Sequence, residues 1–300
     1  KMKKTLIVAI LLAGFFTASA QVTTSSVNGV VTQAAGKKTA GATIKAVHQP
    51  SGTVYSGVSN SSGYFNLPNL RVGGPYTIEI TYANLRPVIY NDVYLQLGEP
   101  FAADATLTQE SETSIEAVKI VAVGRNSKKN GATTIVGRKQ LESMPTLSRS
   151  LQDFTRLTPQ ANGNSFGGAN NRYNNITIDG AVNNDVFGLS GSGTPGGQAG
   201  TQPISLDAIQ EIQVALAPFD VTQGNFTGAG VNAVTRSGTN KFEGSLYFFG
   251  RNEKTIGKSV ITGEKSSKFS DSQYGLRVGG PLIKDKLFFF FNAESGRRTS

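Results

Sequence analysis

One short motif in this chain has the residue types of a nucleophilic catalyst. Gly163-Asn164-Ser165-Phe166-Gly167 matches the G-x-S-x-G pattern, in which a serine on a sharp strand-to-helix turn attacks an acyl carbon. The serine needs a histidine base, but the only histidine is His48, far away in the chain and expected at the surface near a strand end. Because Asn and Gly surround Ser165, we interpret the motif as a loop and keep a secreted hydrolase only as a third alternative.

A second motif, Gly191-Ser192-Gly193-Thr194-Pro195-Gly196, matches the glycine-rich turn that binds dinucleotides. That turn needs a strand before it and a helix after it, and residues 196–200 are too rich in glycine to begin a helix. Asp179 and Asp185 lie near Asn side chains that could join them on calcium, but their spacing is not that of an EF-hand loop. We predict no catalytic residue, no cofactor and no metal site, with calcium left open. Binding or transport must then carry the function.

Charge and cysteine content exclude further classes. Lys and Arg number 29 against 20 Asp and Glu, a formal net charge of +9. These charges are scattered, whereas a nucleic-acid surface requires them clustered, so no nucleic-acid partner is predicted. The chain has no cysteine, which excludes disulfides and a lipid-modified N-terminal cysteine. Stability must therefore come from burial and from pairing between strands.

Residues 1–20 have the composition of an export signal. Lys1, Lys3 and Lys4 precede an apolar stretch from Leu6 to Phe16, and Ala18-Ser19-Ala20 supplies the small residues that a signal peptidase reads. The apolar stretch is about half of the roughly 20 residues that span a bilayer as a helix, so a short membrane anchor is the less favoured alternative. We predict cleavage before Gln21 and an exported envelope protein.

Residues 21–109 alternate like a series of short strands. The run Tyr76-Thr77-Ile78-Glu79-Ile80 is typical, and turn residues such as Ser51-Gly52 and Ser61-Ser62-Gly63 separate the runs. Strands at this spacing predict a small antiparallel β-sandwich. Residues 110–131 differ, because polar residues there surround one apolar island from Ile115 to Val123. They indicate a linker that carries one extended segment.

Residues 132–238 mix short helices with strands. Leu147, Leu151 and Phe154 fall at helical spacing, with Ser148 in a capping position. Strands are expected at residues 176–178 and 212–214, and the stretch from Asn183 to Thr201 is too rich in Gly and Ser to bury much, which predicts a long loop. This region is therefore expected to be an α+β unit.

Residues 239–300 show the alternation of transmembrane strands. Apolar Tyr274, Leu276 and Val278 alternate with polar or small residues, and the next segment is similar. In that segment one face carries Leu287, Phe289 and Phe291 and the other carries Phe288, Phe290, Asn292 and Glu294. The tight connection is expected at Gly279-Gly280-Pro281 together with Lys284-Asp285-Lys286. Such alternation over about ten residues, with an aromatic-rich face, is required of an outer-membrane strand, and a soluble sandwich is the alternative.

Strands placed in lipid must belong to a closed ring, because each unpaired backbone group there costs several kcal/mol. Closed barrels begin at about eight strands, and the residues after Asn240 supply fewer. We therefore expect this chain to be an N-terminal piece of a longer protein.

Several stretches resemble TonB-dependent outer-membrane receptors, in particular the Oar-like branch with an N-terminal carboxypeptidase-regulatory-like domain. The stretch from Gly228 to Ser245 is similar to the plug-to-barrel junction, the stretch from Tyr274 to Phe290 to the hairpin that follows, and Asn175 to Gly180 to a plug motif. The regulatory-like domain is resembled at Gly29-Val30-Val31 and Ser62-Gly63-Tyr64-Phe65. Despite the domain's name, the resemblance implies no peptidase activity and no enzyme.

The resemblance implies a mainly β protein of five parts. They are a signal peptide at 1–20, an Ig-like or transthyretin-like antiparallel β-sandwich at 21–109, a linker at 110–131, an α+β plug at 132–238 and the first strands of a barrel at 239–300. The complete barrel would have ~22 strands around the plug. The location implied is the cell outer membrane, with the N-terminal domain and the plug on the periplasmic side.

The apolar island of the linker resembles the TonB box, the segment that couples such receptors to the inner membrane. An extended segment on a flexible tether can add a strand to a partner's sheet edge. The alternative is a final strand of the sandwich, and Lys119 is a departure that leaves the limits of the box open. The candidate residues are Ile115, Glu116, Ala117, Val118, Lys119, Ile120, Val121, Ala122 and Val123.

The function implied is gated active uptake of an unidentified extracellular ligand. The implied partners are a TonB-like periplasmic energy-coupling protein and outer-membrane lipid. Plug loops would contact the ligand, and the candidate residues are Asn170, Asn171, Arg172, Asn183, Asn184 and Asp185. A surface adhesion or secretion-linked protein on the same barrel is the alternative.

Overall fold

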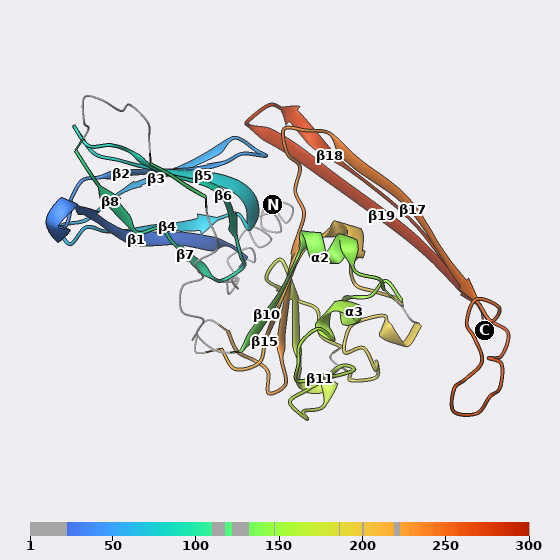
Figure 1. Ribbon diagram of the computed structural model, residues 1–300. Coiled ribbons are helices and arrows are strands. Elements are labelled where there is room, and N and C mark those ends of the chain that lie inside the picture. Colours follow the sequence, from blue (N-terminus) through green and yellow to red (C-terminus); the bar gives the residue numbers. More distant parts are fainter. Residues whose placement is uncertain are drawn as a thin grey trace, which may run out of the picture.

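The computed structural model describes residues 23–109, 118–121, 132–146, 148–185, 187–199, 201–218 and 223–299. These residues form three β-rich parts, which are a two-sheet sandwich, a mixed sheet with short helices, and three long strands (Figure 1). They are called here the sandwich, the plug unit (residues 132–238, named after the plug that the resemblance predicts) and the wall strands (residues 243–299). The predicted signal peptide lies outside the described residues.

The sandwich is made of two sheets that share one core. One sheet has the order β4-β1-β7, with β8 also paired to β1, and the other has the order β3-β2-β5-β6-β9. The elements are β1 (Ser25–Gln33), η1 (Ala34–Gly36), β2 (Thr43–His48), β3 (Thr53–Val58), β4 (Tyr64–Leu70), β5 (Gly73–Thr81), β6 (Val88–Leu95), β7 (Pro100–Ala102), β8 (Ala105–Leu107) and β9 (Val118–Val121).

Alternate residues of the sandwich strands are buried, as the sequence predicts. Ile44 on β2 and Ile78 and Ile80 on β5 are fully buried, and the same core contains Val27 and Val31 of the opposite sheet. Burial of this kind stabilises each large aliphatic side chain by about 1.5–3 kcal/mol. The packing of these alternate side chains in one core thus holds the two sheets together.

The prediction of a purely antiparallel sandwich is wrong at three pairings. Strand β1 pairs in parallel with β7 and with β8, and β6 pairs in parallel with β9. Alternation reports which face of a strand is buried, but it carries no information on the direction of the neighbouring strand. His48 also differs from expectation, because it is 4% exposed, its Nδ1 lies 2.6 Å from Ser51 Oγ, and its ring packs on Tyr76.

The plug unit contains a five-stranded mixed sheet of order β10-β15-β16-β13-β14. Strand β13 runs parallel to β16, and the other pairs are antiparallel. The elements are β10 (Thr133–Gly137), α2 (Arg138–Ser143), α3 (Leu151–Thr155), β11 (Ala161–Asn162), β12 (Ser165–Phe166), η2 (Asn171–Tyr173), β13 (Asn175–Ile178), β14 (Ala181–Val182), η3 (Gly197–Ala199), η4 (Leu206–Ala208), β15 (Ile209–Ala215) and β16 (Gly230–Thr235). The two predicted strands are confirmed as β13 and β15.

Helix α3 begins two residues later than a cap at Ser148 would place it. Ser150 is the N-cap, and it forms a capping box with Asp153, whose carboxylate also accepts a hydrogen bond from Ser148 N. Leu151 and Phe154 are buried, as their spacing predicts. Leu147 lies outside the described residues.

The wall strands are β17 (Glu243–Asn252), β18 (Ser270–Ile283) and β19 (Leu287–Thr299), joined in that order into an antiparallel sheet. The predicted turn is only partly correct, because Gly279-Gly280-Pro281 lies within β18 and the turn is confined to Lys284–Lys286. Asp285 there has a φ of 60°, a left-handed conformation that Asp and Asn tolerate better than most residues. The short turn lies near the sandwich, and the long loop between β17 and β18 lies at the far end (Figure 1).

The two faces of the wall strands have opposite chemistry. Leu246, Tyr274 and Leu276 are among the exposed apolar side chains of one face, and Leu246 pairs across the ladder with Leu276. The other face carries Ser245, Arg277 and Asn292 in one cross-strand row. An apolar outer face and a polar inner face are what a strand in an outer-membrane barrel needs.

Among the described residues, no helix has both the length and the apolar character needed to cross a membrane.

Candidate functional site: the seam between the plug unit and the wall strands

A cluster of ion pairs joins the plug unit to the wall strands. Glu142 on α2 is its centre, because Oε1 lies 3.0 Å from Arg138 Nε, 3.1 Å from Arg236 Nη2 and 3.9 Å from Arg277 Nη2. Arg138 also reaches across to the wall, where its Nη2 is 3.0 Å from Glu243 Oε2. Charge-assisted contacts of this kind fix the position of α2 against β17 and β18.

Arg236 is the most buried cation of this cluster, with a side chain that is only 5% exposed. Its Nε donates to the carbonyl oxygen of Ile209 at 3.0 Å, which ties the end of β16 to β15. Burial lowers the pKa of the guanidinium, and the positive charges of Arg277 and Arg138 lower it further, while Glu142 partly compensates. Arginine stays charged under such conditions, so Arg236 is a fixed positive charge at the seam.

A second set of contacts lies further along the wall. Arg277 Nε donates to Ser245 Oγ at 2.8 Å, and Ser245 Oγ in turn donates to Asp207 Oδ2 of η4 at 2.5 Å. Ser205 holds η4 in place, because its side chain caps the backbone N–H of Asp207. The plug unit thus offers carboxylates from two separate elements to a single arginine of the wall.

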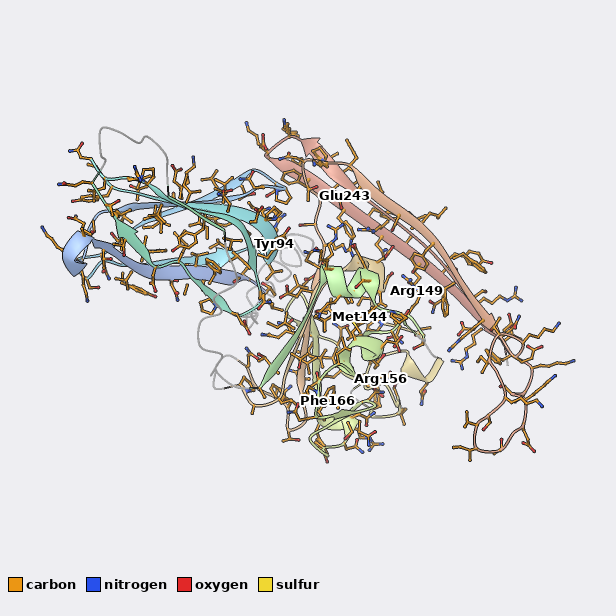
Figure 2. All side chains as sticks on the ribbon, in the orientation of Figure 1. Tyr94, Met144, Arg149, Arg156, Phe166 and Glu243 are labelled. Atoms are coloured by element: carbon orange, nitrogen blue, oxygen red, sulfur yellow. The ribbon has the colours of Figure 1, made fainter. Side chains whose placement is uncertain are left out.

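Tyr247 forms a third contact between the two parts. Its hydroxyl lies 3.3 Å from Ser205 Oγ and donates to Glu294 on β19, and the Arg149 guanidinium lies over its ring at 3.9 Å from the centroid. Gly275 makes room for this ring, because a Cβ atom at that position would overlap the Tyr247 ring atoms. Figure 2 shows Arg149 between α3 and the wall strands.

The predicted ligand-contacting residues fall on two neighbouring loops at the plug unit's end away from the sandwich. Asn171 Nδ2 donates to Gly191 O at 2.9 Å, which links the η2 loop to the loop after Asp185. Most of their polar groups hold the loops themselves, since Asn170 caps η2, Asn184 Oδ1 accepts from Ile176 N, and Asp185 accepts from Phe187 N and Ser190 N. The contact role of these residues stays a prediction.

Sequence reasoning missed three exposed apolar side chains on the same loops. Tyr173 is 59% exposed, Phe187 83% and Leu189 65%. The loop hydrogen bonds described above hold the backbone on either side of them. For Phe187 and Leu189 the available signal was a hydrophobic residue within a Gly- and Ser-rich stretch, because such a stretch forms no core that could bury it.

The other side of the plug unit contacts the sandwich. Leu97 N donates to Glu211 Oε1 at 2.5 Å, and Gln213 Nε2 donates to Leu97 O at 3.0 Å. Val72 and Leu97 of the sandwich pack on Val234 of β16. Burial raises the pKa of the Glu211 carboxyl to about 7, against the hydrogen bond from Leu97, and the charge of Glu99 adds to the increase.

The candidate TonB box is described only between Val118 and Val121. There it forms β9, which pairs in parallel with Val88–Asn91 at the edge of the sandwich. This is the geometry of the alternative in which the segment is a final sandwich strand. The remaining candidates, Ile115 to Ala117, Ala122 and Val123, lie outside the described residues, and the box stays a prediction.

The residues considered for enzyme or metal chemistry have other partners. Ser165 Oγ donates to Ala169 O at 2.6 Å, and Asp179 accepts hydrogen bonds from Thr235 N and Thr235 Oγ1. Asp185 is occupied by its own loop, as described above. Within the described part of the chain, no group of three or more His, Cys, Asp or Glu side chains could hold a metal ion.

Two family models match the chain. The carboxypeptidase regulatory-like domain matches residues 26–108, and the outer membrane beta barrel domain matches residues 234–300. The first range is the sandwich, and the second begins at the end of β16 and contains the wall strands.

Two curated proteins are similar along most of the chain. The TonB-dependent transporter Oar of Myxococcus xanthus is 26% identical over 269 residues, covering 78% of this chain and 23% of the relative. The probable TonB-dependent siderophore receptor PirA of Acinetobacter baumannii is 27% identical over 211 residues, covering 64% of this chain and 26% of the relative. The chain therefore spans about a quarter of the length of these relatives.

Among solved structures, the siderophore receptor PirA from Acinetobacter baumannii superposes with a TM-score of 0.43 at 24% identity, covering 55% of this chain and 24% of that chain. Together, the family models and the curated relatives confirm the resemblance to TonB-dependent receptors. The protein is located in the outer membrane, and it carries a carboxypeptidase regulatory-like domain and an outer-membrane β-barrel domain.

Proposed function

We propose that the protein takes up an extracellular ligand by gated, energy-dependent transport through a barrel that the plug unit closes. The observation that carries this proposal is the composition of the seam. The plug unit meets the wall strands through arginine–carboxylate pairs and hydroxyl contacts at Arg138, Arg277 and Tyr247. When such an interface opens, water can replace the lost polar contacts, so the free-energy cost of separation is small. Separating a dry apolar interface would cost more, because it exposes apolar surface to water.

The energy for opening would come from a TonB-like periplasmic protein acting on Ile115 to Val123. The backbone of Val118–Val121 is extended and able to pair with a sheet edge, since it already does so with β6. The same backbone groups would pair with a strand of the partner, which is β-strand addition. The outer loops with Tyr173, Phe187 and Leu189 would meet the ligand from the cell exterior.

The first experiment tests energy coupling in the full-length receptor. Proline at Val121 removes a backbone donor within the candidate box, and proline at Ser127 is the matched change elsewhere in the linker. We expect V121P to abolish site-specific cross-linking to the periplasmic domain of the TonB-like protein and S127P to retain it. Equal cross-linking by both variants would show that Ile115–Val123 is not the coupling segment.

The second experiment separates uptake from adhesion. Ferric siderophores carrying radioactive iron are suitable probes, because a curated relative is named as a probable siderophore receptor. Cells with the full-length protein should accumulate one of them, while deletion of Ile115–Val123 or a protonophore should stop accumulation and leave surface binding. Attachment of cells that survives the deletion, with no energy-dependent accumulation of any probe, would favour the adhesion alternative.

A further inference from the structure

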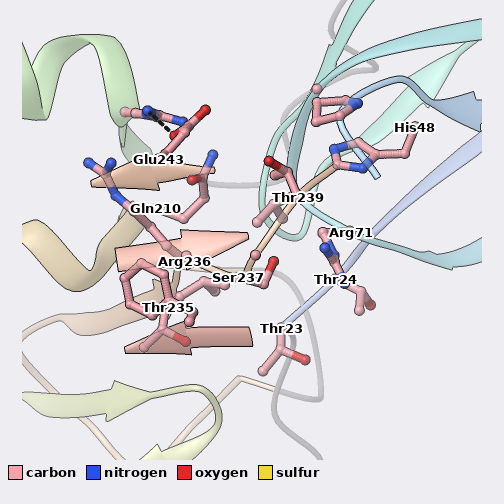
Figure 3. A pocket seen from close by; sticks show the side chains of 18 of the residues that line it. Thr23, Thr24, His48, Arg71, Gln210, Thr235, Arg236, Ser237, Thr239 and Glu243 are labelled. Atoms are coloured by element: carbon pink, nitrogen blue, oxygen red, sulfur yellow. Dashed lines mark hydrogen bonds and ion pairs between the residues drawn. The ribbon is translucent and has the colours of Figure 1, made fainter. Parts of the chain in front are cut away.

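A cavity of about 870 Å³ lies where the sandwich, the plug unit and the wall strands meet. Figure 3 shows His48 and Arg71 on the sandwich side and Gln210, Arg236 and Glu243 on the other side. Ligand-binding cavities in proteins commonly measure about 300–1,000 Å³, so this one could hold an organic molecule of moderate size. It lies at the end of β13 and β16 that is opposite the loop with Tyr173.

Positive charge dominates the lining of this cavity. The two carboxylates of the lining are already engaged, because Asp179 accepts from Thr235 and Glu243 pairs with Arg138. Within the described residues, neither Arg71 nor Lys241 has a carboxylate within ion-pair distance. The cations that line the cavity are Arg71, Lys241, Arg138, Arg236 and Arg277.

Two guanidinium groups keep a buried donor atom without an acceptor. The Nη1 atoms of Arg236 and of Arg71 are both buried and have no hydrogen-bond partner among the described residues. The Arg236 side chain is 95% buried as a whole, since only 5% of it is exposed. A buried donor on a charged group that lacks an acceptor is costly, and an anion in the cavity would supply one.

We propose that this cavity binds an oxyanion group, either free phosphate or the phosphate of a small organic molecule, with Arg71 and Arg236 as its donors. Arginine presents its N–H groups in a fixed fork that suits phosphate oxygens. His48 beside Arg71 is neutral, because burial and then the charge of Arg71 lower its pKa to about 4. The site is separate from the outer loops and requires no transport activity.

The test measures phosphate binding by calorimetry on the full-length receptor in detergent, with chloride at equal ionic strength as the blank. We expect saturable binding that Arg71→Gln weakens at least about fivefold, because a charged donor to phosphate is lost. Arg71→Lys keeps the charge and should retain part of the affinity. Arg156→Gln is the matched control, since Arg156 is an exposed arginine of the plug unit outside this cavity. This variant should bind phosphate with the affinity of the unaltered protein.

A second variant leaves every arginine in place. Gln210→Glu adds a carboxylate to the lining and should also weaken phosphate binding. In the unaltered protein, bound phosphate should raise the pKa of His48 towards its ordinary range, which the NMR resonance of its imidazole ring measures. Tighter binding of glycerol 3-phosphate than of inorganic phosphate would identify an organic phosphate as the occupant. Absence of binding to the unaltered protein, or equal affinity of Arg71→Gln, Gln210→Glu and Arg156→Gln, would overturn the proposal.

Discussion

The sandwich and the wall strands use the same alternating pattern and bury opposite kinds of residue. Ile78 and Ile80 of β5 point their apolar side chains into a closed core, whereas Leu246 and Leu276 of the wall strands point theirs outwards. The polar face of the wall strands lies instead against the plug unit, through Arg277 and Tyr247. An alternating sequence therefore specifies two chemically distinct faces, and the surrounding solvent decides which of them is inside.

The strongest way to test this contrast is to remove core volume from the sandwich. Ile78→Ala deletes three carbon atoms from a fully buried site, and we expect a loss of about 2–5 kcal/mol in the stability of this domain. Hydrogen exchange of the β2 and β5 amides in the full-length protein measures it. Val58→Ala, at a position that is 66% exposed, should change exchange by less than about 0.5 kcal/mol; an equal loss at both positions would contradict the assigned core.

A charge on the outer face of the wall strands tests the other half of the contrast. Leu276→Arg should destabilise the barrel of the full-length receptor in lipid by about 2–4 kcal/mol, because the cation would meet hydrocarbon. Ile261→Arg, in the loop between β17 and β18 and 96% exposed, should be close to neutral. Urea unfolding in bilayers measures both, and a neutral Leu276→Arg would indicate that this face is in water.

The contact between sandwich and plug unit should depend on pH. The pKa of Glu211 in the docked state is about 7, above the roughly 4.3 of a free glutamate. The docked protein therefore binds the Glu211 proton more tightly than the undocked protein does. Docking should therefore be strongest below about pH 4.3 and weaken as the pH rises through 7.

Exchange protection of the Leu97 amide, corrected for its intrinsic rate, should fall at least about tenfold between pH 5.5 and pH 8. Glu211→Gln should keep the protection and remove its pH dependence, because the amide oxygen can still accept from Leu97 N. A pH profile that Glu211→Gln leaves unchanged would show that another group titrates.

The smallest effect is expected at the seam itself. Glu142→Gln removes the carboxylate that three arginines share, but its side chain is 47% exposed, so screening by water limits the loss to about 1 kcal/mol. Faster exchange of the α2 amides at low salt, with a smaller difference at high salt, would show the ionic origin. A salt-independent change would point to packing instead.

Periodicity and turn chemistry were sufficient to predict the sandwich strands, two strands of the plug unit and the sense of the wall strands' two faces, but not β10 or β16. Strands β13 and β15 and the buried face of β5 follow directly from which residues alternate. The direction of β7 and β8 could not be predicted, because it depends on how the chain returns across the sheet. The turn after Ile283 was placed too broadly, since Gly279-Gly280-Pro281 has turn-forming residues that here continue a strand.

The seam was not predictable from the sequence, and the reason is geometric. Glu142, Asp207 and Arg277 belong to three elements that are distant in the chain, and each is an ordinary charged residue in its own context. Their convergence depends on the packing of α2 and η4 against β18. The loop candidates were easier to find because Asn and Gly mark loops, yet most of their amides hold the loop backbone.

Position 275 should tolerate substitution much less than the positions on either side of it. On either side of it, the side chains of Tyr274 and Leu276 are exposed on the apolar outer face, next to Phe248 and Leu246, and could be exchanged for other apolar side chains. At position 275 a single added methyl group would displace the Tyr247 ring, and with it the ring's contact to Ser205. In a library of all single substitutions, we expect position 275 to accept glycine and nothing larger, while its two neighbours accept other apolar residues.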